Sequence, residues 1–251
     1  MASYESFAEV YDMYMDNVPY EKWCQNLLAL LKNEGIKEGI VAELGCGTGK
    51  MTRRLQRAGF DMIGIDCSYD MLGIAMEKGP SDILYLCQDM REFELYGTVA
   101  AIVSVCDSIN YLTEDGDLAK VVRLANNYLD PGGVFIFDMN TKYKYQEMLA
   151  DHVFAENRDE GSFIWENEYD EESGINAYDL TLYIKDEALG VFYRYEEEHF
   201  QRAYDLEEIK AAIASGGMVF VDAYDVDTMG PLRAQTQRMY IVCKEQGKEM
   251  K

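Results

Sequence analysis

Three glycines near residue 45 could shape a turn that binds an anion. Gly45, Gly47 and Gly49 follow the apolar run 40–44, which is typical of a buried strand. Glycine adopts positive φ and has no Cβ, so the backbone can come close to a ligand there. A helix is expected from about residue 50 to residue 58, and the free N–H groups at its start can hold a carboxylate or another anion. By itself this pattern only predicts a tight turn between a strand and a helix.

Two acidic residues extend the turn into a pocket for a nucleoside. Asp66 ends the apolar strand 61–66, and in a βαβ unit an acid at the end of the second strand hydrogen-bonds a ribose hydroxyl. Asp89 and Met90 end the next apolar run, 83–90. The carboxylate can accept from an adenine amino group while the apolar side chain packs on the ring. The turn and the two acids together predict an adenosine pocket.

Five segments in this order resemble the class I S-adenosylmethionine-dependent methyltransferases. They are the glycine turn, the strands ending in Asp66 and Asp89, and the segments 103–112 and 129–138, the last of which begins Leu-Asp-Pro-Gly-Gly. The resemblance implies methyltransferase activity with S-adenosyl-L-methionine as the cofactor. A nicotinamide-dependent dehydrogenase is the alternative. Those folds prefer G-x-G-x-x-G, whereas here the third glycine comes two residues after the second.

The resemblance also implies which residues bind the cofactor. Glu43 would fix the turn and the amino end of the methionine portion, although a purely structural role in the turn is equally open. Cys67 would pack near the adenine, and Cys106 would lie near the methionine portion. The expected cofactor-binding residues are Tyr11, Tyr20, Glu43, Gly45, Cys46, Gly47, Gly49, Asp66, Cys67, Asp89, Met90 and Cys106.

An aromatic-rich arm precedes the pocket. It is similar to the arm of small-molecule N-methyltransferases, including those acting on amino sugars, in which an arm tyrosine reaches over the cofactor. Tyr11 matches that tyrosine, and Tyr20 is expected to contact the cofactor carboxylate. Packing is the alternative for both, because aromatic residues of the arm recur at helical spacing.

Tyr111 and His199 are the candidate catalytic residues. In the sugar enzymes a histidine follows the fourth strand, and Tyr111 stands at that position here. This difference argues against a sugar as the acceptor. A phenol can hydrogen-bond an acceptor but is a poor base at neutral pH. His199 lies on a predicted strand, and a structural histidine near a sheet edge is the alternative. Methyl transfer itself is an in-line displacement that mainly requires alignment, although an amine must be neutral to attack.

The charge of the chain bears on its partners. Acidic residues number 46 against 23 basic ones, giving a formal net charge of −23. This charge repels phosphates, so we expect no nucleic-acid partner and a small-molecule acceptor. An amine-bearing acceptor is the sharper interpretation, and an acidic surface that serves solubility is the alternative. A homodimer is also among the expectations.

Other compositional features concern location and metals. No apolar stretch of 18 residues and no signal-peptide pattern is present, which predicts a cytoplasmic protein without contact to a membrane. Six cysteines include no C-x-x-C pair and the chain has two histidines. We therefore expect small buried thiols and no metal site.

Strands and helices alternate up to Asp138, which predicts an α/β fold with a Rossmann-like, doubly wound, seven-stranded and mostly parallel sheet. A helix is expected after Pro19, and Asp205 with Glu208 predicts a capping box on the last helix. The core is expected to consist of residues 1–150 and 205–251, with final strands at 218–222 and 238–244.

An insertion interrupts this core at residues 151–204. Alternation and β-forming residues predict three antiparallel strands there, at 162–169, 176–184 and 191–204. We expect a small substrate-binding or cap subdomain. The predicted function is methyl transfer to a small molecule, with amines among the candidates. The alternatives are a protein or ribosome-associated target and a non-catalytic protein that binds the cofactor.

Overall fold

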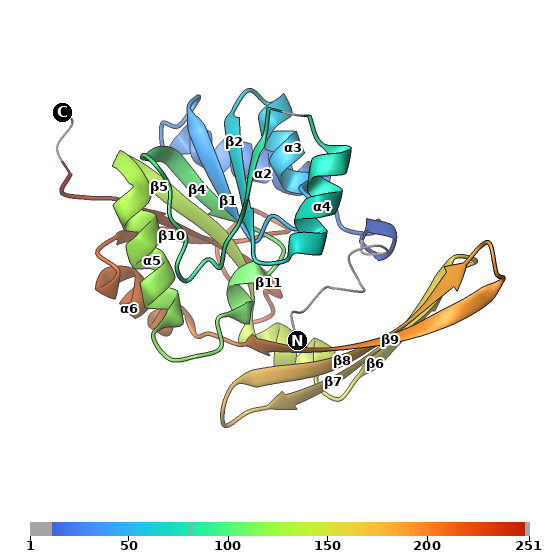
Figure 1. The fold of residues 1–251 in the computed structure, drawn as a ribbon. Helices are drawn as coiled ribbons and strands as arrows, with labels where there is room; N and C mark the ends of the chain where they lie inside the picture. The colour runs from blue at the N-terminus through green and yellow to red at the C-terminus, as the bar shows by residue number, and fades with distance from the viewer. Residues whose placement is uncertain (1–11, 81, 249–251) are drawn as a thin grey trace.

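The computed structural model describes residues 12–80 and 82–248. Two sheets organise them (Figure 1), and the strands are β1 Ile40–Leu44, β2 Asp61–Asp66, β3 Leu84–Cys87, β4 Val99–Ser104, β5 Leu129–Asn140, β6 Val153–Asn157, β7 Gly161–Asp170, β8 Ile175–Asp186, β9 Val191–Arg202, β10 Val219–Asp225 and β11 Arg238–Lys244. The α-helices are α2 Tyr20–Asn33, α3 Lys50–Arg57, α4 Tyr69–Lys78, α5 Asp117–Tyr128 and α6 Leu206–Ser215. A 3₁₀ turn, η1, spans Ser108–Tyr111, and a π-helical turn, η2, spans Lys144–Leu149.

The larger sheet has the strand order β10-β11-β5-β4-β1-β2-β3. Its strands are parallel except for β11, which runs antiparallel to both β5 and β10. This arrangement confirms the predicted seven-stranded, mostly parallel, Rossmann-like sheet. The four-stranded antiparallel sheet β6-β7-β8-β9 is separate from it and corresponds to the predicted insertion.

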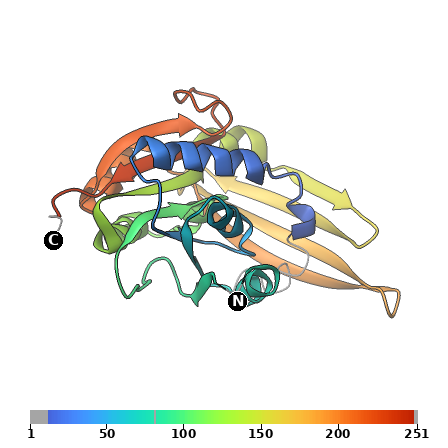
Figure 2. The same cartoon turned by 90° about the horizontal axis from the view of Figure 1, so that it is seen from above.

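Helices cover both faces of the larger sheet, which explains why its strands are almost continuously apolar. On one face, α5 and α6 pack on alternate strand residues such as Leu44 and Phe135. On the other face, α2 and α3 pack on residues such as Val41 and Ile136. Figure 2 shows α2 lying along its face of the sheet, while the smaller sheet projects to the side.

Local signals in the sequence account for several element ends. The predicted helix after Pro19 is α2, with Pro19 as its N-cap residue. The predicted capping box is present: the Glu208 carboxylate accepts from the Asp205 N–H at 2.8 Å, and the Asp205 side chain accepts in return from the backbone of residue 208. This box starts α6 immediately after the inserted sheet and so fixes where the chain re-enters the core.

The smaller sheet differs from expectation in one respect. The sequence predicts three strands, but β6 pairs antiparallel with β7 and adds a fourth. Several β6 residues are exposed, so the strand has no clear inward face and forms through its pairing with β7. The third core strand is also shorter than the predicted run, because β3 ends at Cys87. Within residues 12–80 and 82–248, no helix is long and apolar enough to cross a membrane.

Candidate functional site

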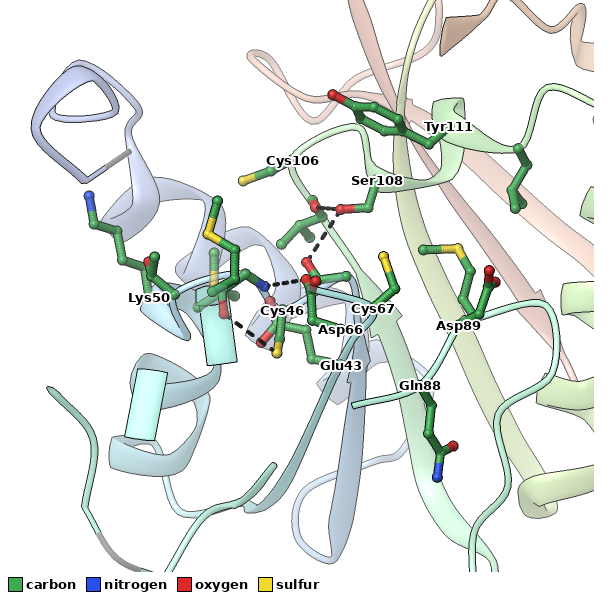
Figure 3. Close-up of a pocket in the computed structure, with 18 of the residues that line it drawn as sticks. Glu43, Cys46, Lys50, Asp66, Cys67, Gln88, Asp89, Cys106, Ser108 and Tyr111 are labelled. Atoms are coloured by element: carbon green, nitrogen blue, oxygen red, sulfur yellow. Dashed lines mark hydrogen bonds between the residues drawn. The ribbon is translucent and has the colours of Figure 1, made fainter. Parts of the chain in front are cut away.

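A cavity of about 350 Å³ lies at the carboxyl ends of β1, β2, β3 and β4. Open α/β sheets bind ligands at this edge. Figure 3 shows side chains from the glycine turn, the strand ends and η1 around the cavity. The predicted cofactor residues that line it are Tyr20, Glu43, Gly45, Cys46, Gly47, Asp66, Cys67, Asp89, Met90 and Cys106. Tyr111, predicted as catalytic, lines it as well.

Two predicted residues, Gly49 and His199, do not belong to this lining. Gly49 is the N-cap of α3, where its φ is 72° and a Cβ would lie 2.5 Å from the Tyr85 hydroxyl. Its need for glycine therefore comes from packing. Tyr11 lies outside the described residues. His199 is buried in the smaller sheet and contacts Tyr111, which lines the cavity.

Asp66 connects the end of β2 to the glycine turn. One carboxylate oxygen accepts from the Gly47 N–H at 2.8 Å, and the other accepts from the Ser68 N–H at 2.8 Å. Burial raises the pKa of Asp66, and the backbone hydrogen bonds oppose that rise. The carboxylate thus sits at the cavity with two fixed donors, and Figure 3 places it beside Cys46 and Cys67.

Glu43 lies at the end of β1 and is 1% exposed. Its carboxyl group accepts from the Thr52 hydroxyl at 2.5 Å. Burial raises the pKa of Glu43 to about 8, and the nearby Asp66 adds to the rise. This rise favours the protonated form at neutral pH, in which the carboxyl group can both donate and accept hydrogen bonds.

Asp89 is held by Arg91 at the adenine side of the predicted site. The Arg91 Nε lies 3.0 Å from one carboxylate oxygen, and Nη2 lies 2.5 Å from the other. Hydrogen bonds from this guanidinium lower the pKa of Asp89. Arg91 also contacts Asp117 of α5 at 3.3 Å.

The turn itself depends on glycine at Gly45. Its φ is 68°, and a Cβ there would lie 2.5 Å from the side chain of Ser108 in η1. The Ser108 hydroxyl donates to the carbonyls of Val105 at 3.0 Å and of Gly45 at 3.3 Å. Close contact between the turn and η1 therefore requires a residue without a side chain.

The segment that leads into η1 is strained and firmly held. Cys106 and Asp107 have φ values of 63° and 53°, which non-glycine residues rarely adopt. The fully buried Asp138 carboxylate accepts from both of their N–H groups, at 3.1 and 2.7 Å. Arg238 of β11 bridges Asp107 at 2.5 Å and Asp138 at 3.1 Å. Gln201 of β9 donates to Asp107 at 2.7 Å.

Tyr111 and His199, the two predicted catalytic residues, meet where η1 contacts the smaller sheet. The Tyr111 hydroxyl lies 3.2 Å from the His199 Nδ1 and 2.5 Å from the Tyr178 hydroxyl. The Tyr178 ring stacks on the imidazole with centroids 4.7 Å apart. The His199 Nε2 lies 3.2 Å from the Glu197 carboxylate. The site therefore combines a phenol at the cavity edge with a buried imidazole and a carboxylate behind it.

The N-terminal end of the described chain is fastened beside the turn. The Asp12 carboxylate accepts from the Thr48 hydroxyl at 2.7 Å and from the Lys78 amine at 2.9 Å. Lys50, which lines the cavity, lies 3.3 Å from the same carboxylate. Burial raises the pKa of Asp12, but the hydrogen bonds from Lys78 and Thr48 outweigh it, so the net pKa is lowered.

The sequence analysis missed several residues of the cavity wall. They are Thr48, Lys50, Met51, Met71, Gln88, Arg91, Val105, Ser108 and Leu112. Most of these residues are adjacent in sequence to a predicted one, and this adjacency is the feature of the sequence that could have identified them. The cysteines also differ from expectation, because Cys67 and Cys87 are exposed. Cys87 ends β3, the edge strand of the core sheet, so no further strand covers it.

Comparisons with known proteins agree with this geometry. A protein-family model described as a methyltransferase domain matches residues 41–133. YqeM of Bacillus subtilis (strain 168), a protein named as a methyltransferase, is 32% identical over 245 residues, covering 94% of this chain and 95% of that protein. The crystal structure of an S-adenosylmethionine-dependent methyltransferase from Clostridium acetobutylicum ATCC 824 is 28% identical, with a TM-score of 0.86 over 97% of this chain and 99% of that one.

The name of a more distant relative specifies its substrate. The dTDP-3-amino-3,4,6-trideoxy-alpha-D-glucopyranose N,N-dimethyltransferase of Streptomyces venezuelae is 27% identical over 146 residues. The match covers 57% of this chain and 60% of that protein.

Proposed function

Because the chain belongs to the class I S-adenosylmethionine-dependent methyltransferases, we propose that it methylates a small-molecule acceptor, with amines as the preferred class. The observation that carries the proposal is the position of Tyr111. Its side chain lines the cofactor cavity and is hydrogen-bonded to His199 of the inserted sheet. A group that faces the cavity is thereby linked to a buried base.

The residues of the cavity fit the cofactor. A volume of about 350 Å³ lies in the range of small-ligand pockets. Asp66 would hold the ribose hydroxyls, and Asp89 with Met90 would hold the adenine. Glu43 and the amides of the glycine turn would hold the methionine portion. S-adenosylmethionine supplies a methyl group already activated on a sulfonium, so the chain has to align the acceptor and manage its proton.

Tyr111 and His199 are proposed to manage that proton. An amine attacks only as the neutral base, and the methylated nitrogen must shed a proton to become neutral again. The Tyr111 hydroxyl, with hydrogen-bonding partners on both sides, can orient the acceptor nitrogen at the cavity. His199 can accept the proton that Tyr111 passes on.

Two further observations favour an amine. The formal net charge of −23 attracts cationic molecules and repels phosphate-rich ones. The name of the Streptomyces venezuelae relative specifies an amino sugar as its substrate. We also propose that the protein forms a homodimer and that its acidic charge disfavours a nucleic-acid partner.

Residues 151–204 are proposed to act as a substrate or cap subdomain on a core of residues 1–150 and 205–251. The support is the inner face of the smaller sheet, where Tyr178 and His199 reach Tyr111. Hydrogen bonds from Asn110 to the Arg202 carbonyl, at 2.8 Å, and from Gln201 to Asp107 fasten the same sheet to the loop after β4.

The test begins with calorimetric titration of the purified protein with S-adenosylhomocysteine. It continues with a screen for consumption of S-adenosylmethionine over amines, amino sugars, carboxylates and small phenols. Micromolar binding and turnover confined to amine-bearing compounds is the expected result. Turnover of phenols or carboxylates alone would refute the amine assignment. Transfer of labelled methyl to a cellular protein would refute a small-molecule acceptor.

A further inference from the structure

We propose that Glu197 is a positioning residue that fixes the tautomer of His199 and thereby directs the Tyr111 hydroxyl as a proton donor to the imidazole. The catalytic role rests on the proposed function, whereas the tautomer of His199 can be measured without it. It assigns a role to an acid that lies outside the lining of the cofactor cavity.

The strand β9 places one glutamate of three on the inner face of the sheet. Glu196, Glu197 and Glu198 are consecutive, and side chains alternate between the two faces of a strand. Glu196 and Glu198 are exposed, whereas the Glu197 side chain is only 8% exposed and lies two residues from His199 on the same face. Burial of a carboxylate costs free energy unless hydrogen bonds and charge compensate for it.

The contact between Glu197 and His199 fixes where the imidazole proton resides. The Nε2 atom lies 3.2 Å from a carboxylate oxygen, and the His199 side chain is fully buried. A carboxylate can only accept, so Nε2 must carry the hydrogen. In the neutral ring Nδ1 then has the lone pair, and the Tyr111 hydroxyl at 3.2 Å donates to it.

The direction of the hydrogen bond from Tyr111 to His199 also determines the direction of the hydrogen bond between Tyr178 and Tyr111. Because Tyr111 donates to His199, the Tyr111 oxygen accepts from the Tyr178 hydroxyl at 2.5 Å. A phenol oxygen has two lone pairs and can accept from more than one donor, and the Tyr111 side chain lines the cavity. The titratable groups against the imidazole include Tyr111 from η1, Tyr178 from β8 and Glu197 from β9.

This order of donors defines a balanced proton transfer. The proton of the acceptor nitrogen passes to the Tyr111 oxygen as the Tyr111 proton passes to the His199 Nδ1. The electron pair of the broken N–H bond stays on the nitrogen. Glu197 stabilises the resulting imidazolium by its negative charge, as a carboxylate behind a catalytic imidazole does.

The first experiment reads the tautomer directly and needs neither cofactor nor acceptor. Two-bond ¹H–¹⁵N correlation spectra of ¹⁵N-labelled protein distinguish Nε2–H from Nδ1–H imidazoles. The chain has two histidines, so a His152→Gln variant assigns the signals. We expect the Nε2–H form for His199 in the wild type and in Glu198→Gln, the matched control on the opposite face. In Glu197→Gln we expect a mixture of the two tautomers.

A wild-type spectrum with the Nδ1–H tautomer would overturn the proposal, even if the protein proves to be a methyltransferase. An unchanged tautomer in Glu197→Gln would overturn it too. If that variant does not fold, Glu197→Asp replaces it. The shorter side chain keeps the charge and should retain the Nε2–H form in part.

The second experiment uses an acceptor that turns over in the amine screen. Glu197→Gln should lower kcat at least tenfold while calorimetric affinity for S-adenosylhomocysteine stays within twofold. Glu198→Gln should match the wild type. Equal kcat in the two variants would refute the positioning role, whereas failure of the whole screen would count against the proposed function and leave the tautomer result intact.

Discussion

The Asp66 carboxylate accepts a hydrogen bond from the Gly47 N–H at 2.8 Å and so joins the end of β2 to the glycine turn that follows β1. Gly47 is at φ 52°, in the left-handed region that glycine adopts without steric cost. The same carboxylate accepts from the Ser68 N–H, which starts the turn into α4. One side chain therefore organises the polar groups on both sides of the proposed ribose position.

The first prediction concerns substitution of Asp66. Asp66→Ala should lower the affinity for S-adenosylhomocysteine by about 1–3 kcal/mol, because both backbone donors and the ribose hydroxyls lose their acceptor. Asp66→Asn should lose less, since its amide oxygen can still accept from one donor. Calorimetry measures both, with Asp61→Ala, at the exposed start of the same strand, as the control. Affinity that is unchanged in Asp66→Ala would remove Asp66 from the site.

The second prediction follows from the buried carboxyl group of Glu43. Its pKa is raised from 4.5 to about 8 by burial, with Asp66 adding to the rise against the hydrogen bond from Thr52. Between these values the folded protein retains a proton that the unfolded chain releases. The free energy of unfolding should therefore fall as the pH rises from about 5 to about 8, by up to about 1.4 kcal/mol per pH unit from this group.

Glu43→Gln isolates that contribution, because glutamine is neutral at every pH. Chemical denaturation at a series of pH values should give a shallower decline for Glu43→Gln than for the wild type. Glu38→Gln, on an exposed residue before β1, serves as the control and should follow the wild type. Parallel curves for Glu43→Gln and the wild type would mean that Glu43 is ionised in the folded protein.

The third prediction concerns Tyr111. Tyr111→Phe removes the hydroxyl that connects Tyr178 and His199, while the ring still fills its place beside the cavity. Turnover should fall by about 100-fold or more, in the range typical for loss of a proton-transferring group. Calorimetric affinity for S-adenosylhomocysteine should change little. Tyr96→Phe, on a fully exposed tyrosine, is the control. Equal rates in the two variants would leave Tyr111 as a packing residue.

Local patterns in the sequence predicted much of the core. The strands β1 and β2 begin and end at the predicted residues, as does β11. They are short apolar runs bounded by turns and buried on both faces, so periodicity and turn chemistry agree. The glycine turn, Asp66 and Asp89 were found because their spacing is set by two consecutive βαβ units, β1-α3-β2 and β2-α4-β3.

Other features depend on contacts that the sequence does not display. The strand β6 forms through pairing with β7 rather than through its own pattern. Alternation along β9 puts Glu197 on the same face as His199, but only the contact of His199 with Tyr111 of η1 shows that this face is the inner one. Arg238 and Asp107 are 131 residues apart, and β11 must enter the sheet beside β5 before they can meet. Such contacts depend on the order of the strands in the sheet, which a short stretch of sequence does not determine.

The last prediction concerns the buried charge cluster formed by Arg238, Asp107 and Asp138. The guanidinium contacts both carboxylates and lies 4.9 Å from the ring centroid of Trp23. Burial raises the pKa of Asp138, and the charge of Arg238 opposes that rise. Replacing Arg238 by methionine keeps much of the side-chain volume but leaves the fully buried Asp138 without this counter-charge. Removal of one partner from a buried ion pair typically costs about 3–5 kcal/mol.

Arg238→Met should therefore lower the free energy of unfolding by about 3–5 kcal/mol, with a Tm lower by roughly 10 °C. It should also weaken binding of S-adenosylhomocysteine, because the strained Cys106–Asp107 segment loses support from Arg238. Arg194→Met is the matched control, since Arg194 is exposed and pairs with Glu196 on the surface; a surface pair contributes at most about 1 kcal/mol. Denaturation curves and calorimetry on both variants provide the measurement. If Arg238→Met proves as stable as Arg194→Met, the backbone hydrogen bonds to Asp138 hold the segment without help from the cation.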